Sequence, residues 1–401
     1  MNLVVQKFGG TSVADRERLF HVASIVTQTY EQGNNVVVVV SAQGDTTDDL
    51  IEKAAEVNRH PSARELDMLL STGEQISISL LAMAIEALGF PVISLTGWQA
   101  GFQTTSSHGK ARIDRIDTER IANELAKRNI VVVAGFQGLS KYDDITTLGR
   151  GGSDTSAVAL AAALEADVCQ IYTDVDGVYT ADPRIVPGAQ KLSEITFDEM
   201  IELASLGAQV LQSRAVEMAM KYNVELEVLS SMQKLPGTKV KEVVTVEKML
   251  IRGVACDDNV ARISVIGVPD TVGMAAKIFM MLASKKINVD IILQTVSVGG
   301  KKDISFTVTK EDREQAMELL QSIQKEYGID ELRYDEDVAK VSIVGSGMQS
   351  NPGVAATLFD ALASADVNIQ LISTSEIKIS VLVEASAAKR AINAIHSAFF
   401  E

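Results

Sequence analysis

The sequence of 401 residues is poor in cysteine, tryptophan and histidine, with two, one and four residues respectively. Cys169 and Cys256 lie in apolar stretches, as is typical of small buried thiols in a cytoplasmic protein. No run of 18 apolar residues occurs, so we expect no membrane-spanning helix. Residues 1–5 lead straight into a strand-like segment, so we also expect no signal peptide.

Basic residues are also scarce, because 37 Lys and Arg stand against 53 Asp and Glu, a net charge of −16. This balance argues against non-specific partners such as nucleic acid or an anionic membrane. An anionic ligand would have to be held by a local cluster of cations and backbone N–H groups. The apolar fraction of 46% is enough for a large core, and the length predicts about two to three domains. We therefore expect a soluble, cytoplasmic metabolic enzyme.

Residues 1–230 alternate between strand-like and helix-like periods, which predicts a layered α/β domain. In such folds ligands bind at the carboxyl ends of the strands. The predicted strands are rich in β-branched residues and are Leu3–Phe8, Val36–Ser41, Val92–Leu95, Ile130–Phe136, Val168–Thr173 and Val224–Leu229. The predicted helices have apolar residues at three- and four-residue spacing and are Arg16–Tyr30, Arg64–Leu88, Thr118–Arg128, Asp154–Ala166 and Ala208–Lys221.

The C-terminal part contains an internal repeat, in which Ile263–Gly267 matches Val341–Gly345 about 80 residues later. Each copy reads strand, glycine-containing loop, helix, strand, strand, helix, which predicts two small ferredoxin-like α+β modules. The preceding stretch contains Pro-Gly and polar residues typical of a linker. We therefore divide the chain into a domain at 1–230, a linker at 231–248, a first module with its preceding strand at 249–340 and a second module at 341–401.

The segment after the first strand, Lys7-Phe8-Gly9-Gly10, suits an anion. Two glycines let backbone N–H groups approach a phosphate, and Lys7 supplies a point charge. A Gly-Gly pair alone could equally be a simple turn. Lys7, however, stands in an otherwise apolar strand, where a buried ammonium needs a partner.

The segment that most strongly indicates a ligand-binding site is residues 147–156, where three glycines flank Arg150 and precede Ser153 and Asp154. A guanidinium in a permissive loop can bind a carboxylate through two hydrogen bonds. Asp154, at a helix start, would lie near any bound phosphate. The alternative is a plain glycine-rich turn.

Two further segments supply polar groups after strands or within a helix. Ser41 and Thr47 could hold a ligand or could cap the helix expected near Asp48. Glu74 lies between apolar residues and could meet a cationic ligand group or form a salt bridge on its helix.

The segment 172–184 offers Asp for ribose hydroxyls, Tyr for stacking and Arg for phosphate. It lacks the final Glu of an EF-hand loop. The chain also lacks a GxxxxGK[ST] phosphate loop and the HRD and DFG motifs of protein kinases.

Together these five motifs resemble those of the aspartokinases, a branch of the amino acid kinase family, and the repeat resembles their tandem ACT domains. The resemblance covers essentially the whole chain. It implies ATP- and Mg²⁺-dependent phosphorylation of the β-carboxylate of L-aspartate, the first step toward lysine, threonine and methionine, with feedback regulation at the ACT domains. A carboxylate is already ionised at pH 7 and needs no general base, which agrees with the absence of His from all five motifs.

The resemblance also implies residue roles. Catalysis would rest on Lys7 and Asp154. The residues implied for aspartate are Ser41, Thr47, Glu74, Arg150, Gly151 and Ser153, with Arg150 on the α-carboxylate and Glu74 near the ammonium. Those implied for ATP are Lys7, Phe8, Gly9, Gly10, Thr173, Asp174, Tyr179, Asp182 and Arg184. Those implied for lysine or threonine as effector are Asp270, Gly273, Met274, Ala275, Asn288, Val289, Asp290, Gln294, Asn368 and Ile369. No resident metal site is predicted.

Gln212 and Ser213 replace a His-Pro-like pair of the family, where we expect little effect on catalysis. We also expect a homo-oligomer formed through the ACT domains, and a shorter regulatory subunit starting near Met249. Three alternatives stay open. The chain could phosphorylate another small carboxylate or amino acid, it could be a non-catalytic amino acid sensor, or the repeats could serve only to dimerise it.

Overall fold

The computed structural model describes residues 1–207, 210–243, 250–349 and 351–401, which form two compact units. The first unit contains most of the chain up to residue 243. The second contains the residues from Leu250 onward, the segment Thr180–Ala189 and a short stretch that begins at Leu206. The expected start of a shorter subunit, Met249, lies outside the described residues.

The first unit is built on an eight-stranded sheet in the order β10-β12-β11-β9-β1-β2-β6-β3. The six strands from β11 to β3 are parallel, so their carboxyl ends meet at one edge. Three predicted strands are confirmed residue for residue: β1 (Leu3–Phe8), β3 (Val92–Leu95) and β9 (Val168–Thr173). The other members of the sheet are β2 (Asn35–Val40), β6 (Ile130–Ala134), β10 (Glu194–Thr196), β11 (Leu226–Ser230) and β12 (Thr238–Lys241).

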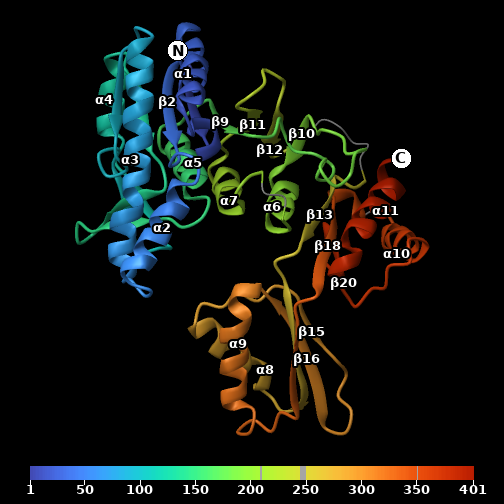
Figure 1. Cartoon of the computed structure of the whole chain (residues 1–401). Coiled ribbons are helices and arrows are strands. Elements are labelled where there is room, and N and C mark those ends of the chain that lie inside the picture. The colour runs from blue at the N-terminus through green and yellow to red at the C-terminus, as the bar shows by residue number, and fades with distance from the viewer. Residues whose placement is uncertain (208–209, 244–249, 350) are drawn as a thin grey trace. The chain divides into compact units, whose positions relative to one another are not determined.

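Helices cover both faces of this sheet (Figure 1). α1 (Arg16–Glu31) and α3 (Ala63–Ala87) pack on one face, whereas α5 (Gly152–Ala163) packs on the other with α7 (Ser213–Tyr222) beside it. Because both faces are covered, the five valines of β2 are all fully buried. A continuous apolar run is therefore the sequence signature of these central strands.

α3 is long and apolar enough by length and composition to cross a membrane. However, 56% of its most apolar window is buried inside the protein. Leu81 and Ile85 are fully buried in the core against α1 and the sheet, and the helix also buries Asp67 and Glu74. We therefore describe it as a core helix of the first unit.

Several elements have no counterpart in the sequence-based prediction. A second sheet in the order β5-β4-β7-β8 lies beside α3. The expected linker carries β12, which pairs with β11 and β10 and buries Thr238 completely, so this part of it is sheet rather than linker. The additional elements are β4 (Phe102–Thr104), β5 (Ile113–Ile116), β7 (Gln137–Ser140), β8 (Ile145–Thr147) and α6 (Phe197–Ser205). Two expected helices are present: α2 (Thr46–Val57), expected near Asp48, and α4 (Glu119–Ala126), within the predicted range Thr118–Arg128.

The second unit contains two four-stranded antiparallel sheets with two helices each. In the first module, α8 and α9 cover one face of the sheet (Figure 1). Its elements are β14 (Ala261–Pro269), α8 (Met274–Ser284), β15 (Ile292–Gln294), β16 (Lys301–Val308), α9 (Lys310–Ile323) and β17 (Glu331–Asp335). Those of the second module are β18 (Val338–Val344), α10 (Val354–Ser364), β19 (Leu371–Thr374), β20 (Lys378–Glu384) and α11 (Ala388–Phe400).

One strand differs from the sequence-based division. β13 (Gly253–Asp257), which we assigned to the first module, pairs with β18 in the sheet of the second. The reason is that the chain after β17 supplies only three strands, so the fourth comes from before the first module. The first module is therefore an insertion within the second.

The segment 180–189 contributes to the core of the second module. Ala181 and Val186 are buried in the same apolar cluster as Ile343 and Ile395. The backbone N–H of Val254 donates to the carbonyl of Thr180 (2.7 Å). A segment that lies within the kinase-like sequence is thus built into the fold of the C-terminal unit.

Candidate active site

The carboxyl ends of the parallel strands open into a cleft of about 1080 Å³. It brings together nine of the residues predicted for catalysis or for binding aspartate or ATP, namely Lys7, Gly10, Ser41, Thr47, Glu74, Arg150, Gly151, Ser153 and Asp154. Five basic side chains line this cleft beside five acidic ones: Lys7, Lys110, Arg112, Arg150 and Arg214 with Asp48, Asp67, Glu74, Asp154 and Glu217. The cleft therefore offers local cations within a strongly acidic chain, although its lining is not basic overall.

Lys7 and Asp154 form an ion pair at the floor of the cleft. The Nζ of Lys7 lies 2.6 Å from Oδ1 of Asp154, and the two side chains are only 12% and 11% exposed. Lys7 projects from β1, and Asp154 lies in the first turn of α5, where the helix N-terminus favours negative charge. The partner that a buried lysine requires is thus a residue 147 positions away in the chain.

The loops after β1 and β2 approach each other so closely that Gly10 has no room for a side chain. A Cβ at this position would lie 2.5 Å from the carbonyl oxygen of Ala42. The backbone of Gly10 can therefore lie directly beside the loop that carries Ser41.

Glu74 is the most strongly perturbed acid of the cleft. It is 3% exposed, and its Oε1 accepts a hydrogen bond from the backbone N–H of Ala42 (3.1 Å). Its Oε2 has no partner in hydrogen-bond geometry among the residues that the structure describes, although the side chain of Gln137 lies close enough to favour the ionised form. Burial raises the pKa of Glu74 to about 8. An ammonium group entering here would supply both a donor and a compensating charge.

Arg150 lies on the loop between β8 and α5, where Gly149 and Gly151 adopt positive φ angles of 81° and 68°. No carboxylate of the described residues lies within ion-pair distance of its guanidinium, which is exposed to the cleft. The group is therefore free to take a carboxylate from solution.

Sequence reasoning missed two buried or half-buried residues that organise the cleft walls. Asp67 is 1% exposed and accepts hydrogen bonds from the backbone N–H of Gly109 (2.9 Å) and from the hydroxyl of Thr147 (2.6 Å). Arg214 donates to the carbonyls of Ala111 and Leu148, both at 3.3 Å. A carboxylate inside the apolar pattern of α3 was the only sequence signal for either residue.

The structure does not bring the remaining residues predicted for ATP into this cleft. The side chain of Phe8 is fully buried and stacks on Tyr172 at 4.5 Å, so only its backbone could meet a ligand. Thr173 ends β9 and Asp174 follows it, and their side chains hydrogen-bond each other. The Tyr179 hydroxyl donates to Asp176 (2.7 Å).

Asp182 and Arg184 belong to the second unit, because they lie in the segment 180–189. Arg184 donates to the Asp182 carboxylate from its backbone N–H (2.9 Å) and its guanidinium (2.7 Å). This partner lowers the pKa of Asp182. The pair is therefore preformed.

Most of the residues predicted for effectors lie at two ends of the first module's sheet, whereas Asn368 and Ile369 lie in the second module. Gly273, at φ 89°, begins α8 beside Met274 and Ala275, and the N–H of Asp270 donates to the Gly300 carbonyl (2.9 Å). At the other end of β16, the N–H of Asp290 donates to the Thr307 carbonyl (3.1 Å). The loop after α8 also carries Asn288 and Val289, β15 ends at Gln294, and the corresponding loop after α10 carries Asn368 and Ile369. They therefore form no single pocket within the described module.

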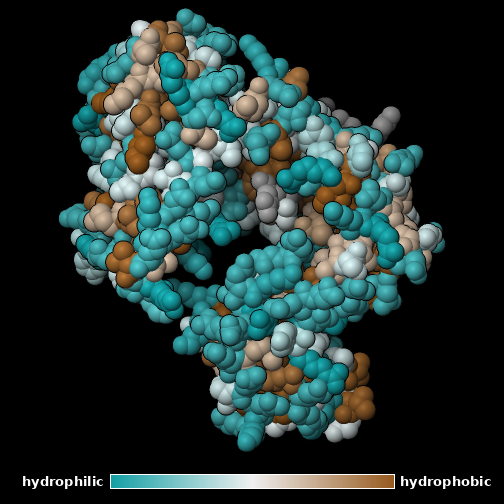
Figure 2. Space-filling view, in the orientation of Figure 1, coloured by the Kyte–Doolittle hydropathy of each residue, from teal (hydrophilic) through white to brown (hydrophobic). Residues whose placement is uncertain are grey.

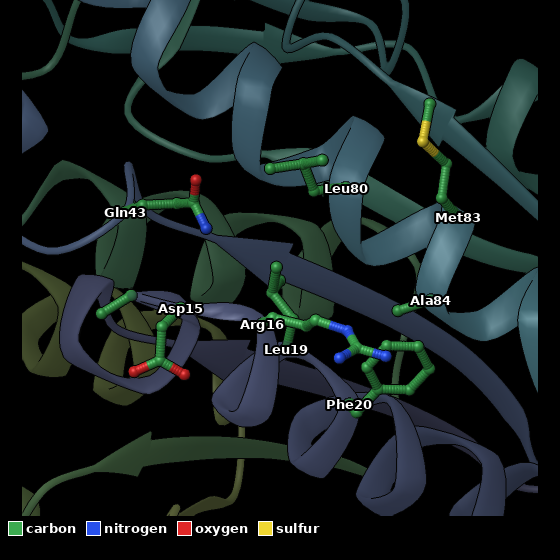
Figure 3. A pocket seen from close by; sticks show the side chains of 9 residues that line it. Asp15, Arg16, Leu19, Phe20, Gln43, Leu80, Met83 and Ala84 are labelled. Carbon is green, nitrogen blue, oxygen red and sulfur yellow. The ribbon is translucent and has the colours of Figure 1, made fainter.

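A second hollow, of about 500 Å³, lies between the start of α1 and α3. Figure 3 shows the guanidinium of Arg16 beside the ring of Phe20, with Leu80 and Met83 projecting from α3. Leu80 and Met83 are 38% and 59% exposed, and apolar surface interrupts the hydrophilic surface over these helices (Figure 2). The residues that line this hollow form no arrangement of catalytic groups. The cleft that contains Lys7 and Asp154 therefore remains the candidate active site.

Comparison with known families agrees with this geometry. Residues 2–230 match the amino acid kinase family, and residues 263–323 and 341–399 each match the ACT domain. The fold and cleft therefore define an amino acid kinase joined to two ACT domains.

Comparison with individual relatives identifies the branch of the amino acid kinase family to which the chain belongs. The chain is 52% identical over 405 residues to an aspartokinase of Mycolicibacterium smegmatis, which covers all of this chain and 96% of that one. Its structure matches E. coli aspartokinase III in complex with aspartate and ADP, with a TM-score of 0.85, 27% identity and full coverage of both chains. It also matches the complex of the same enzyme with lysine and aspartate, with a TM-score of 0.76, 28% identity and full coverage. The chain belongs to the aspartokinase family.

Proposed function

We propose that the protein transfers the γ-phosphoryl group of ATP to the β-carboxylate of L-aspartate and that lysine or threonine regulates it through the ACT domains. The observation that carries this proposal is the cleft itself. It places an unpaired guanidinium, Arg150, and a buried acid with an open oxygen, Glu74, in the same cavity as the Lys7–Asp154 pair. The structural match to an aspartokinase solved with aspartate and ADP supports the choice of substrates.

The roles follow from the charges. Arg150 would bind the α-carboxylate of aspartate through two hydrogen bonds, and Glu74 would accept from its ammonium. Ser41, Thr47, Gly151 and Ser153 would supply further polar contacts. The β-carboxylate is ionised at neutral pH, so the nucleophile needs no base.

Lys7 would stabilise the charge that spreads over the transferring phosphoryl group, while the backbone of Gly9 and Gly10 approaches its oxygens. Asp154 would hold the ammonium of Lys7 in place through their ion pair. ATP would extend from the cleft toward Thr173, Asp174 and Tyr179.

Mg²⁺ would accompany the nucleotide. No cluster of three or more His, Cys, Asp or Glu that could hold a metal is found among the residues that the structure describes. Mg²⁺ typically retains waters and binds through substrate phosphates with one or two carboxylates, so it does not require such a cluster in the protein. The ion would neutralise charge on the phosphates.

Regulation and assembly follow from the second unit. Most of the residues implied for effectors lie at two ends of the first module's sheet, so we propose that two chains pair through their ACT domains and complete each site together. The match to an aspartokinase solved with lysine supports lysine as an effector. We place the enzyme in the cytoplasm. Whether a separate regulatory subunit begins near Met249 is a further part of this proposal.

The test is formation of an acyl phosphate, trapped as a hydroxamate with hydroxylamine. Purified protein is incubated with ATP and Mg²⁺ and with L-aspartate, L-glutamate or N-acetylglutamate, alone and with lysine, threonine or both. We expect hydroxamate from L-aspartate only, and a decrease with at least one effector. Hydroxamate from glutamate but not aspartate would contradict the substrate. None from any of them, together with effector binding measured by calorimetry, would favour the amino acid sensor.

A further inference from the structure

We propose that Gln212, at the N-terminus of α7, is a positioning residue that holds the loop of Arg150 in place for the substrate carboxylate. The proposal rests on the proposed function, because it acts through Arg150. Sequence reasoning passed over Gln212 as a departure of little consequence. The structure places it against the substrate loop, 62 residues away in the chain.

The first observation is a hydrogen bond. The side-chain amide of Gln212 donates from Nε2 to the backbone carbonyl of Arg150, at 3.0 Å. Gln212 is the N-cap residue of α7, yet its side chain makes no capping bond to its own helix. The side chain that would ordinarily satisfy the helix N-terminus is therefore directed to the neighbouring loop.

The second observation is packing. Gly151 follows Arg150 with φ 68°, and a Cβ there would lie 2.5 Å from Cγ of Gln212 and 2.7 Å from its Cβ. The aliphatic part of Gln212 thus covers Gly151 at a separation that only a glycine permits. The loop is therefore held on the C-terminal side of the Arg150 α-carbon, by the hydrogen bond to its carbonyl and by the contact with Gly151.

The third observation is that Arg214, two residues further along α7, holds the chain on the other side. Its guanidinium donates to the carbonyl of Leu148, two residues before Arg150, and to Ala111. Burial is the main cause that lowers the pKa of Arg214, and the charge of Arg112 acts in the same direction. The beginning of α7 therefore fixes the backbone at Leu148, Arg150 and Gly151.

The consequence is specific to the substrate. Gly149 and Gly151 give the loop wide conformational freedom, so an unrestrained Arg150 would lose more entropy on binding a carboxylate. Gln212 reduces this loss before aspartate arrives. Its removal should therefore raise KM for aspartate while leaving kcat and KM for ATP nearly unchanged.

The test compares Gln212→Met, which keeps the length of the side chain but removes the donor, with Gln212→Ala, which also removes the packing. We expect KM for aspartate to rise about 3–10-fold in Gln212→Met and further in Gln212→Ala, with kcat and KM for ATP within twofold of wild type. Met220→Ala, an exposed position on the same helix, is the matched control and should leave all three constants unchanged. Thermal melting of each variant verifies that it folds.

A second arm uses Gly151→Ala alone and combined with Gln212→Gly. Because the added Cβ would collide with both Cγ and Cβ of Gln212, which Gln212→Gly removes, we expect the double variant to have a lower KM for aspartate than Gly151→Ala. The proposal is overturned if Gln212→Met and Gln212→Ala both keep the wild-type KM for aspartate while Arg150→Ala raises it. A wild-type protein that forms no hydroxamate would instead refute the proposed function itself, so the two failures are distinguishable.

Discussion

The Nε2 of His396 lies 2.9 Å from the hydroxyl of Thr180, although 216 residues separate them. His396 is on the last helix, α11, is 1% exposed and stacks on Phe400. Thr180 begins the segment that carries Asp182 and Arg184. The C-terminal helix of the ACT region therefore holds a segment that the motif resemblance assigns to ATP.

The first prediction concerns pH. Burial lowers the pKa of His396 below 6.5, with the charge of Glu401 acting in the opposite direction. At pH values between the lowered native pKa and 6.5, His396 is protonated in the unfolded chain but neutral in the native state. Its contribution to the free energy of unfolding is therefore fully present above pH 6.5 and is lost as the pH falls through the native pKa. We expect the melting temperature of wild type to fall more between pH 7.5 and 5.5 than that of His396→Gln.

The matched control for this measurement is His60→Gln, at an exposed position. It should follow the wild-type pH profile. Parallel profiles for wild type and His396→Gln would show that His396 does not titrate in this range.

The second prediction concerns Glu74, whose pKa is raised to about 8 from 4.5. The native state retains a proton that the unfolded chain releases, so this group's contribution to stability is lost as the pH rises from 4.5 through 8. Glu74→Gln cannot ionise and should be the more stable protein at pH 8.5, yet it should bind aspartate at least about tenfold more weakly because it lacks the charge for the ammonium.

Binding itself should release a proton. The aspartate ammonium favours the ionised form of Glu74, so roughly one proton should leave at pH 7. Calorimetry in buffers of different ionisation enthalpy measures this number, and Glu74→Gln should show no release. A binding enthalpy independent of the buffer in wild type would argue that Glu74 is already ionised in the free cleft.

The third prediction concerns the Lys7–Asp154 pair. Lys7→Met should lower kcat about 10²–10³-fold, since it removes a charge aimed at the transferring phosphoryl group. KM for aspartate should change much less. Asp154→Asn should also lower kcat. Because both residues act through one ion pair, the loss of kcat in the double variant, expressed as a free energy, should be smaller than the sum of the losses in the two single variants. Lys53→Met, on the exposed side of α2, is the control. Unchanged turnover in Lys7→Met would remove this lysine from the mechanism.

Much of the fold was predictable because burial on both faces leaves a simple signature. β1, β3 and β9 have apolar or β-branched residues at nearly every position, and their limits follow directly. The carboxyl-end rule predicted that the segments after β1 and β2 lie at one edge of the sheet, and Lys7 and Ser41 line the same cleft. Short strands lack such a pattern. β4 and β8 have only three residues each, and periodicity cannot be recognised over that length.

The site residues that the sequence did not predict were missed for a different reason. Asp67, Gln212 and Arg214 act on loops that lie 42 to 103 residues away, through side-chain bonds to backbone groups. Nothing in local composition specifies which backbone carbonyl a side chain will reach. In the same way, the Asp182–Arg184 motif indicates chemistry but not the unit in which it packs.

The last prediction concerns Lys340, which is 4% exposed and joins the two modules of the second unit. Its Nζ lies 2.5 Å from Oδ2 of Asp290, in the predicted effector region, and 3.4 Å from Oδ2 of Asp257. Lys340→Met leaves both carboxylates unpaired, so we expect a loss of about 1–3 kcal/mol of stability, less than for a fully buried pair because Asp290 remains accessible. The same change frees Asp290 for a cationic effector, so lysine should inhibit at lower concentration. Lys340→Arg retains the charge and should keep both properties near wild type. If the inhibition constant of lysine is equal in wild type and Lys340→Met, Asp290 does not contact the effector's ammonium, and the pair serves only to join the modules.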